Sequence, residues 1–147
     1  MAQAWLSLGA NIGDPEAQLA EAVRRIAATD NIRVTVQSTL IITKPWGKTD
    51  QPDFANLALE IETALQPHDL LKATQAIETE MGRVRQEVWG PRLIDIDIIA
   101  YGRLLMFTPE LILPHAHAHE RDFVLQPLRE IAPEVADWVV GMGSGGV

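Results

Sequence analysis

Apolar residues that alternate with polar ones predict two strands in the first half of this chain. Over residues 32–42, isoleucine and valine first occupy every second position, which is typical of a half-buried strand running through that range. The segment 54–62 is rich in helix formers, yet its apolar residues also alternate strictly. We therefore predict a strand there too, with Phe54 and Asn56 on the face turned away from the core.

Two shorter apolar runs predict strands buried in the core. Residues 4–8 form a run that ends at Gly9 and Gly13, which we expect to make the turn after the strand. Neither a GxGxxG spacing nor a Walker lysine accompanies these glycines, so turn residues are a simpler interpretation than a phosphate-binding loop. Residues 93–99 are rich in isoleucine and predict the second core strand.

Two segments repeat apolar residues at the three- and four-residue spacing of an amphipathic helix. The first is expected to begin at Pro15, with Asp14 as its N-cap, and to end near Ala28. The second is expected to begin near Pro67 and to stop at Gly82, since glycine is common at helix C-termini.

The C-terminal third gives weaker signals. We expect a helix start at 108–110, a short amphipathic helix over 121–128 that is cut at Pro127, and a flexible tail over 141–147. Taken in chain order, the stronger elements read strand-helix-strand-strand-helix-strand. This order predicts an α+β sandwich of ferredoxin-like arrangement, with a mainly antiparallel sheet, in a single domain that spans 1–147.

Composition excludes several classes of protein. The 147 residues include 12 basic and 20 acidic side chains, and the net charge of −8 argues against a general nucleic-acid binder. No cysteine is present, so disulfides and thiolate chemistry are excluded, which fits a reducing cytoplasm. No apolar run approaches the roughly 20 residues that cross a bilayer, and the N-terminus lacks a signal-peptide pattern. We expect a cytoplasmic monomer with neither a nucleic-acid nor a membrane partner.

Two acids interrupt the isoleucine-rich strand. Because strand side chains alternate between faces, Asp95 and Asp97 share one face, opposite Ile94, Ile96 and Ile98. Carboxylates two residues apart can converge on a small divalent cation, and acids are rare in such a strand without compensation. The alternative is that both acids lie on the solvated face of an edge strand.

Three arginines precede this strand and favour the metal interpretation. Arg83, Arg85 and Arg92 lie within ten residues of an otherwise acidic chain. Guanidinium groups that face a metal-binding carboxylate pair are suited to binding a polyphosphate. Polyphosphate chemistry is therefore the leading hypothesis from the residues alone.

A second candidate region precedes the strand at 54–62. Residues 43–53 are dense in proline, glycine and polar side chains, and their apolar residues follow neither a helix nor a strand repeat. A connection of that length without regular structure is more often functional than not. Phe54 and Asn56 follow this loop and offer a ring and an amide, which suit a flat heterocycle.

Three histidines alternate at His115, His117 and His119 and could be mistaken for a zinc site. No cysteine or further histidine completes a tetrahedral ligand set nearby. One histidine that contacts a phosphate is the simpler hypothesis.

The ordered motifs resemble those of the 6-hydroxymethyl-7,8-dihydropterin pyrophosphokinase family of folate biosynthesis, over about residues 6–133. The motifs that carry the resemblance are 8–14, 43–47 with 50–56, 82–85, 89–92, 95–97, and 114–115 with 119–125. Each motif alone would be weak, but their common order makes chance similarity improbable.

The resemblance implies transfer of the terminal diphosphate of ATP to the hydroxymethyl group of the pterin, with release of AMP and with two Mg²⁺ ions as cofactors. It implies that Asp95 and Asp97 bind the metal ions and that Arg83 and Arg92 act in catalysis. The residues implied to bind ATP are Gln75, Glu78, Arg85, Trp89, Arg92, Ile98, His115 and Arg121. Those implied to bind the pterin are Thr43, Pro45, Trp46, Phe54, Asn56 and Phe123.

Two other functions stay open at the level of sequence. A magnesium-dependent nucleotidyltransferase would use the same acid pair but would release diphosphate rather than AMP. A ferredoxin-like regulatory module would bind a small ligand without catalysis, and its acids would be merely solvated.

Overall fold

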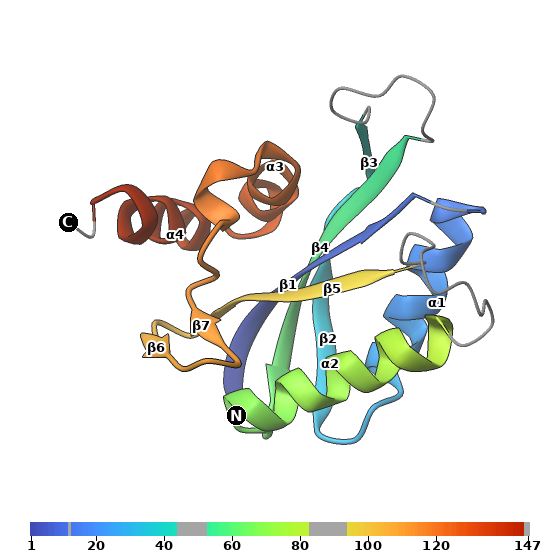
Figure 1. The fold of residues 1–147 in the computed structure, drawn as a ribbon, viewed down its shortest axis with the longest axis horizontal. Helices are drawn as coiled ribbons and strands as arrows, with labels where there is room; N and C mark the ends of the chain where they lie inside the picture. The colour runs from blue at the N-terminus through green and yellow to red at the C-terminus, as the bar shows by residue number, and fades with distance from the viewer. Residues whose placement is uncertain (12, 44–52, 83–93, 146–147) are drawn as a thin grey trace.

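The structure is a computed structural model that describes residues 1–11, 13–43, 53–82 and 94–145. Strands and helices alternate through its first two thirds, and helices close the chain (Figure 1). The strands are β1 (Ala2–Ala10), β2 (Ile32–Gln37), β3 (Ile41–Thr43), β4 (Phe54–Thr63), β5 (Asp95–Tyr101), β6 (Met106–Phe107) and β7 (Ile112–Leu113). The helices are α1 (Pro15–Ala27), α2 (Pro67–Gly82), the 3₁₀ helix η1 (Ala118–Glu120), α3 (Asp122–Ile131) and α4 (Pro133–Gly145).

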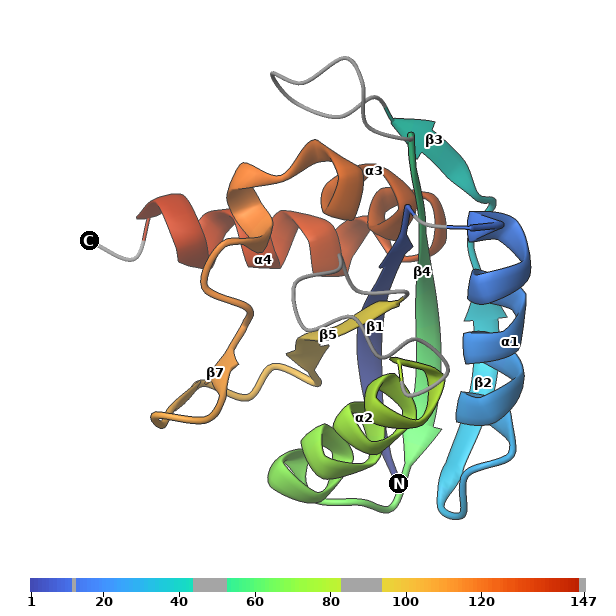
Figure 2. The ribbon, with the colours of Figure 1, turned by 45° about the vertical axis from the view of Figure 1, so that its right-hand side comes forward.

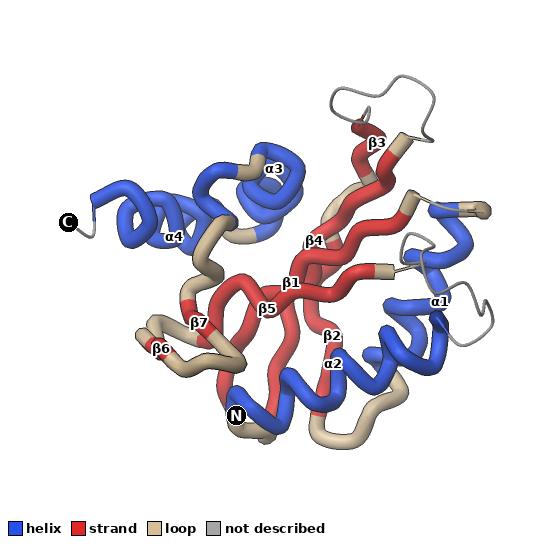
Figure 3. The backbone as a smooth tube through the Cα atoms, viewed as in Figure 1, coloured by secondary structure: helices blue, strands red, loops and turns tan. Residues whose placement is uncertain are grey.

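The main sheet is antiparallel and has the strand order β2-β4-β1-β5. Strand β3 pairs with the first residues of β4, beyond the end of β2 (Figure 3). With α1 after β1 and α2 after β4, this is the ferredoxin-like arrangement predicted from the sequence. The strand over 54–62, which helix propensity alone would have missed, is confirmed. No helix in the described ranges combines the length and the apolar character needed to cross a membrane.

The two predicted helices are confirmed almost to the residue. Helix α1 begins at Pro15, and the Asp14 carboxylate accepts the N–H of Ala17 at 3.2 Å, as an N-cap does. Gly13 has a φ of +65°, which confirms it as a turn residue. Helix α2 spans Pro67–Gly82, and its buried face includes Leu70, Ile77 and Met81.

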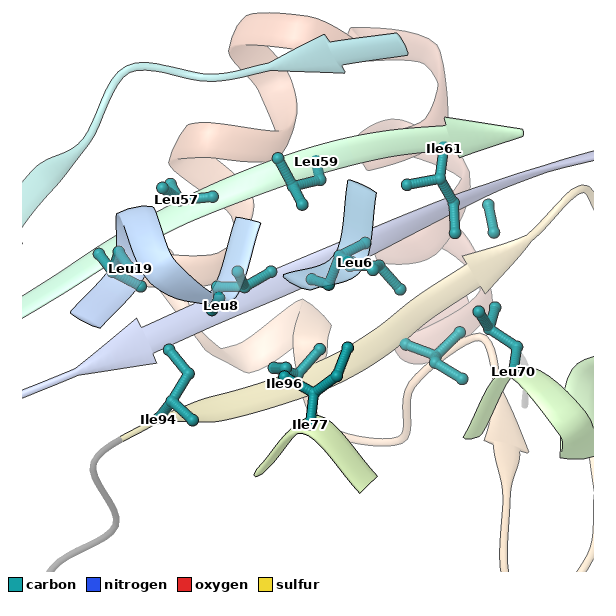
Figure 4. Close-up of a cluster of buried hydrophobic side chains, with 14 of the residues drawn as sticks. Leu6, Leu8, Leu19, Leu57, Leu59, Ile61, Leu70, Ile77, Ile94 and Ile96 are labelled. Carbon is teal, nitrogen blue, oxygen red and sulfur yellow. The ribbon is translucent and has the colours of Figure 1, made fainter. Parts of the chain in front are cut away.

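The sheet separates two hydrophobic cores. One core lies between the sheet and helices α1 and α2 and includes Leu6 and Leu8 of β1, Ile94, Ile96, Leu19 of α1 and Ile77 of α2 (Figure 4). The second core lies on the opposite face, under α3 and α4 (Figure 2). Its members include Trp5, Ala58, Ile99, Ala100, Val124, Leu128, Val135 and Val139. Each large side chain buried in these cores contributes about 1.5–3 kcal/mol to stability.

The strand predicted over 32–42 is divided in two by residues 38–40. Ser38 donates its N–H to Ala58 O at 2.9 Å, and its hydroxyl accepts the N–H of Ala58 at 2.8 Å. The Thr39 N–H donates to the Glu130 carboxylate of α3 at 2.8 Å. Side chains thus replace part of the backbone ladder, which is why the regular strand is interrupted.

Three expectations for the C-terminal third are wrong. Residues 108–110 form the turn between β6 and β7, with the Thr108 hydroxyl accepting the N–H of Leu111 at 3.0 Å, and they begin no helix. Helix α3 continues through the buried Pro127 to Ile131, because its apolar face packs on the sheet. Helix α4 extends to Gly145, so the expected tail is helical through that residue, while 146–147 lie outside the described residues.

Candidate active site

The candidate site lies at one end of the sheet, where β1 ends and β4 and β5 begin. In an antiparallel sheet, residues opposite one another in register share a face. Two rows therefore cross the three neighbouring strands β4, β1 and β5 on the face that carries α3 and α4. The rows are Asn56-Gly9-Asp95 and Ala58-Ser7-Asp97. With neighbouring strands about 4.8 Å apart, Asn56 and Asp95 lie about 10 Å from each other across the sheet.

The two carboxylates occupy the face that alternation predicts. Asp95 is exposed and Asp97 is half-buried, whereas Ile94, Ile96 and Ile98 on the opposite face are buried in the first core. Two residues of strand separate the acids by about 6.6 Å along the backbone. The described residues contain no group of three or more potential metal-ligating side chains. One or two carboxylates completed by phosphate and water oxygens are the ligand set that Mg²⁺ prefers, so the acid pair fits a magnesium-nucleotide site.

Glu78 of α2 connects that helix to the acid-bearing strand. Its carboxylate accepts the backbone N–H of Ile96, the residue between the two acids, at 2.8 Å. Strand β5 is at the edge of the sheet, so this bond provides an acceptor for its unpaired side. Gln75, one turn earlier on α2, is exposed. Neither side chain belongs to the buried stripe of the helix.

His115 is held near Asp97 by its backbone. Its N–H donates to Ile99 O of β5 at 2.9 Å, and its ring Nδ1 accepts the N–H of His117 at 3.2 Å. Burial is the main cause that lowers the pKa of His115, with smaller contributions from the charges of Arg121 and His117, while the nearby Asp97 carboxylate acts in the opposite direction. The lowered pKa favours a neutral ring at pH 7.

The other two histidines of the alternating segment have different surroundings. His117 Nδ1 and His119 Nε2 each lie 3.5 Å from the Glu120 carboxylate. Gly143 of α4 approaches the His119 ring so closely that a Cβ at residue 143 would overlap it. His119 therefore serves as a packing surface for the last helix.

Three of the predicted pterin residues, Thr43, Phe54 and Asn56, lie at the β3–β4 end of the site. Thr43 pairs with Phe54, and the Asn56 Nδ2 donates to Thr43 Oγ1 at 3.4 Å. The expectation that Phe54 and Asn56 face away from the core is wrong in one respect: Asn56 is only 3% exposed, and Ala58 on the same face is buried in the second core. Helices α3 and α4 cover this face, which alternation within a single strand cannot show.

Phe123 and Arg121 meet at the start of α3. Phe123 is 37% exposed, and the Arg121 guanidinium carbon lies 5.9 Å from the centroid of its ring. This geometry allows a cation–π interaction between a residue assigned to the pterin and one assigned to the nucleotide. The exposed ring leaves area for a ligand to stack against.

Comparisons with known proteins show the family of this chain. The model of the 7,8-dihydro-6-hydroxymethylpterin-pyrophosphokinase (HPPK) family matches residues 5–133. This chain belongs to that family. A relative from Methylorubrum extorquens, named 2-amino-4-hydroxy-6-hydroxymethyldihydropteridine pyrophosphokinase, is 51% identical over 135 residues, which are 92% of this chain and 85% of the relative. A relative of the same name from Bacillus subtilis is 46% identical over 132 residues, which are 90% of this chain and 79% of the relative.

Solved structures confirm the fold of this pyrophosphokinase family member. The wild-type HPPK-DHPS of Plasmodium falciparum with pteroate superimposes with a TM-score of 0.72 at 16% identity. The alignment covers 90% of this chain but 39% of the solved one, so the chain spans about two fifths of that larger protein. At this identity, the likeness shows the fold and nothing about ligands.

Part of the predicted pyrophosphokinase site falls outside the described residues. The residues concerned are Pro45, Trp46, Arg83, Arg85, Trp89 and Arg92. Their roles stay predictions. Ile98 is described, but its side chain is buried in the first core on the face opposite Asp97, so only its main chain is placed to contact a nucleotide.

Sequence reasoning missed one feature of the pyrophosphokinase site. Gly9 was expected in a turn, but it lies within β1, at the centre of the row between Asn56 and Asp95. A glycine inside a strand often marks a close approach of another group, and that signal was available in the sequence.

Proposed function

We propose that this chain transfers the terminal diphosphate of ATP to the hydroxymethyl group of 6-hydroxymethyl-7,8-dihydropterin, which yields AMP and the pterin diphosphate in folate biosynthesis. The observation that carries the proposal is the row across three strands that places an amide, Asn56, and a carboxylate, Asp95, on one face about 10 Å apart. A pterin whose polar edge is held at Asn56 would direct its hydroxymethyl group toward the acids.

Asp95 and Asp97 would hold two Mg²⁺ ions together with the ATP phosphates. Bound there, the ions would supply positive charge that offsets the negative charge of the transferring group. An acid pair without a third protein ligand among the described residues suits this role, because it leaves positions for phosphate oxygens.

The chain's own groups would orient the reactants. His115 would donate its Nε2–H to a phosphate oxygen, and the Arg121 guanidinium would pair with phosphate. We propose that Arg83 and Arg92 stabilise the charge of the transition state. The remaining residues proposed to hold ATP are Gln75, Glu78, Arg85, Trp89 and Ile98.

At the other end, Phe54 and Phe123 would stack on the two faces of the pterin ring. Thr43 and Asn56 would hydrogen-bond its polar edge, together with main-chain groups around Pro45 and Trp46. The hydroxyl oxygen would then form its bond to the β-phosphorus as the bond from that phosphorus to the α–β bridging oxygen breaks. AMP leaves with the electron pair of the broken bond, and the hydroxyl proton passes to solvent.

We further propose that the chain acts as a single-domain cytoplasmic monomer. The absence of cysteine from all 147 residues fits a reducing compartment. Light scattering coupled to gel filtration tests the monomer directly, since a dimer would double the expected 16.2 kDa mass.

The reaction is tested by incubating the protein with ATP, MgCl₂ and the hydroxymethyl-dihydropterin and by resolving the nucleotides chromatographically. AMP that forms only when both the pterin and magnesium are present supports the proposal. Asp97→Ala is the matched variant, and it should abolish turnover while its circular-dichroism spectrum stays that of the folded protein. Turnover near the wild-type rate in Asp97→Ala would exclude the proposed role of the acid pair.

A further inference from the structure

We propose that Gly9 is a positioning residue of the pterin site: the absence of a side chain at Gly9 lets the Asn56 amide lie across β1 in the orientation that binds the pterin edge. This inference rests on the proposed function, and it assigns a purpose to a residue at the centre of the site that carries no functional group of its own.

The geometry at Gly9 is specific. Gly9 lies opposite Asn56 on β4 and opposite Asp95 on β5. A Cβ built on Gly9 would lie 2.7 Å from the Asn56 Oδ1, closer than a side-chain carbon can approach an oxygen. The next nearest atoms, Ala55 O and Asn56 Cγ, are both 3.8 Å away, which is ordinary contact. The amide oxygen of Asn56 alone therefore occupies the place of the missing side chain.

This contact helps to set the direction of the Asn56 amide. The Oδ1 lies over the bare Cα of Gly9, while the Nδ2 points to Thr43 Oγ1, 3.4 Å away. Asn56 is only 3% exposed, so contacts with neighbouring protein groups, rather than solvent, determine its orientation. An amide presents a donor on one side and an acceptor on the other, so the orientation decides which of them each part of a ligand meets.

The same geometry indicates that a side chain at residue 9 would disturb the ligand site more than the fold. The obstructing atom is the end of a side chain, which can rotate, rather than part of the backbone. Alanine also costs less conformational entropy than glycine in a strand. The expected consequence of Gly9→Ala is a folded protein in which the Asn56 amide is turned away from its present direction.

Calorimetric titration with 6-hydroxymethyl-7,8-dihydropterin, in the presence of magnesium and α,β-methylene-ATP, tests this inference. Gly9→Ala should weaken pterin binding about tenfold or more, as expected for the loss of one or two hydrogen bonds. Affinity for the ATP analogue should stay within about twofold of wild type. Gly141→Ala is the matched control, because nothing lies within 4 Å of a Cβ at that glycine of α4, and its pterin affinity should be unchanged.

A double-mutant cycle separates a positioning role from a general packing effect. If Gly9 acts through Asn56, the double variant Gly9→Ala/Asn56→Ala should bind the pterin as weakly as Asn56→Ala alone. The double variant also removes the overlap, so it decides the question even if Gly9→Ala folds poorly. Wild-type pterin affinity in Gly9→Ala, or multiplicative losses in the double variant, would overturn the inference. Failure of the wild-type protein to bind the pterin would instead refute the proposed function.

Discussion

The backbone N–H of His117 donates to the ring Nδ1 of His115 at 3.2 Å. A ring nitrogen that accepts a hydrogen bond carries no proton, so the neutral ring of His115 is protonated at Nε2. Burial lowers the pKa of His115, which favours this neutral form. The imidazole therefore presents one N–H donor at its far side, and we propose that this donor meets a phosphate oxygen of ATP.

The affinity of His115 variants for ATP should depend on whether the new side chain places an N–H donor at the position of the ring Nε2. His115→Ala should weaken ATP binding by about 1.5–3 kcal/mol, the typical contribution of a hydrogen bond to a charged group. His115→Gln places an amide N–H near the Nε2 position and should retain more affinity than His115→Asn, which places it near Nδ1. Titration calorimetry with the magnesium complex of α,β-methylene-ATP measures these affinities. Equal losses in Gln and Asn variants would contradict the assignment.

Phe123→Ala should reduce pterin affinity by about 1–3 kcal/mol, if the pterin stacks on the ring as bases stack on aromatic side chains. The same change removes the contact with Arg121, whose guanidinium lies 5.9 Å from the ring centroid. A cation–π contact at an exposed site contributes about 0.5–1 kcal/mol, so ATP affinity should change little. Parallel titrations with each ligand give both values. Lost ATP affinity with unchanged pterin affinity would reverse the assignment of this residue.

Glu78→Ala should destabilise the start of β5, because it removes the acceptor of the Ile96 N–H at 2.8 Å. Loss of a partner for a buried polar group costs about 1–3 kcal/mol. Glu78→Gln keeps an oxygen acceptor and should restore most of the stability. The amide exchange rate of Ile96 is the direct measure, and Thr79→Ala, an exposed neighbour on α2, is the control. Slow exchange of Ile96 in Glu78→Ala would show that this bond does not protect the strand.

The contact between Glu130 and Thr39 predicts a pH-dependent contribution to stability. Two hydrogen bonds from Thr39 lower the pKa of Glu130 from its usual 4.5. The bond from the Thr39 hydroxyl has the larger effect, and the bond from the Thr39 backbone N–H has the smaller one. A carboxylate with a lowered pKa in the folded state stabilises the fold above pH 4.5, and that stabilisation is lost as the pH falls through the folded-state pKa. The melting temperature of Glu130→Gln should therefore be below that of wild type at pH 7.

The difference in melting temperature between Glu130→Gln and wild type should shrink as the pH is lowered below 4.5. Glu134→Gln, at an exposed position in α4, controls for the general effect of removing one negative charge. If the difference in melting temperature stayed constant from pH 7 to pH 3, the charge of Glu130 would not contribute to the stabilising effect of its contact with Thr39.

Local patterns were sufficient to predict the main strands, the first two helices and the acid pair, but not the division of the strand over 32–42. The alternation in β4 and β5 is a property of neighbouring residues, so Asp95 and Asp97 could be placed on one face from the sequence. The same reasoning could not place Asn56 correctly. Its burial depends on a second helical layer and on Gly9 of another strand, neither of which is local to residue 56.

The end of helix α4 was predicted to be a flexible tail, but it is helical through Gly145. Its last turns carry Gly141, Gly143 and Gly145, and each glycine costs about 1 kcal/mol in a helix, so the sequence favoured a flexible tail. Packing overrides that propensity, since α4 lies against α3 and η1, and Gly143 allows the close approach to His119. Such contacts between distant segments are absent from any local pattern.

The proposed transfer of diphosphate is tested most directly by following the phosphorus atoms. ATP labelled separately at the α- and β-phosphorus is incubated with the protein, magnesium and 6-hydroxymethyl-7,8-dihydropterin, and the products are separated. The β-label should move to the pterin, and the α-label should stay in AMP. An α-label on the pterin with release of diphosphate would indicate nucleotidyl transfer, and retention of the β-label in ADP would indicate transfer of a single phosphate. Either result would contradict the proposed reaction.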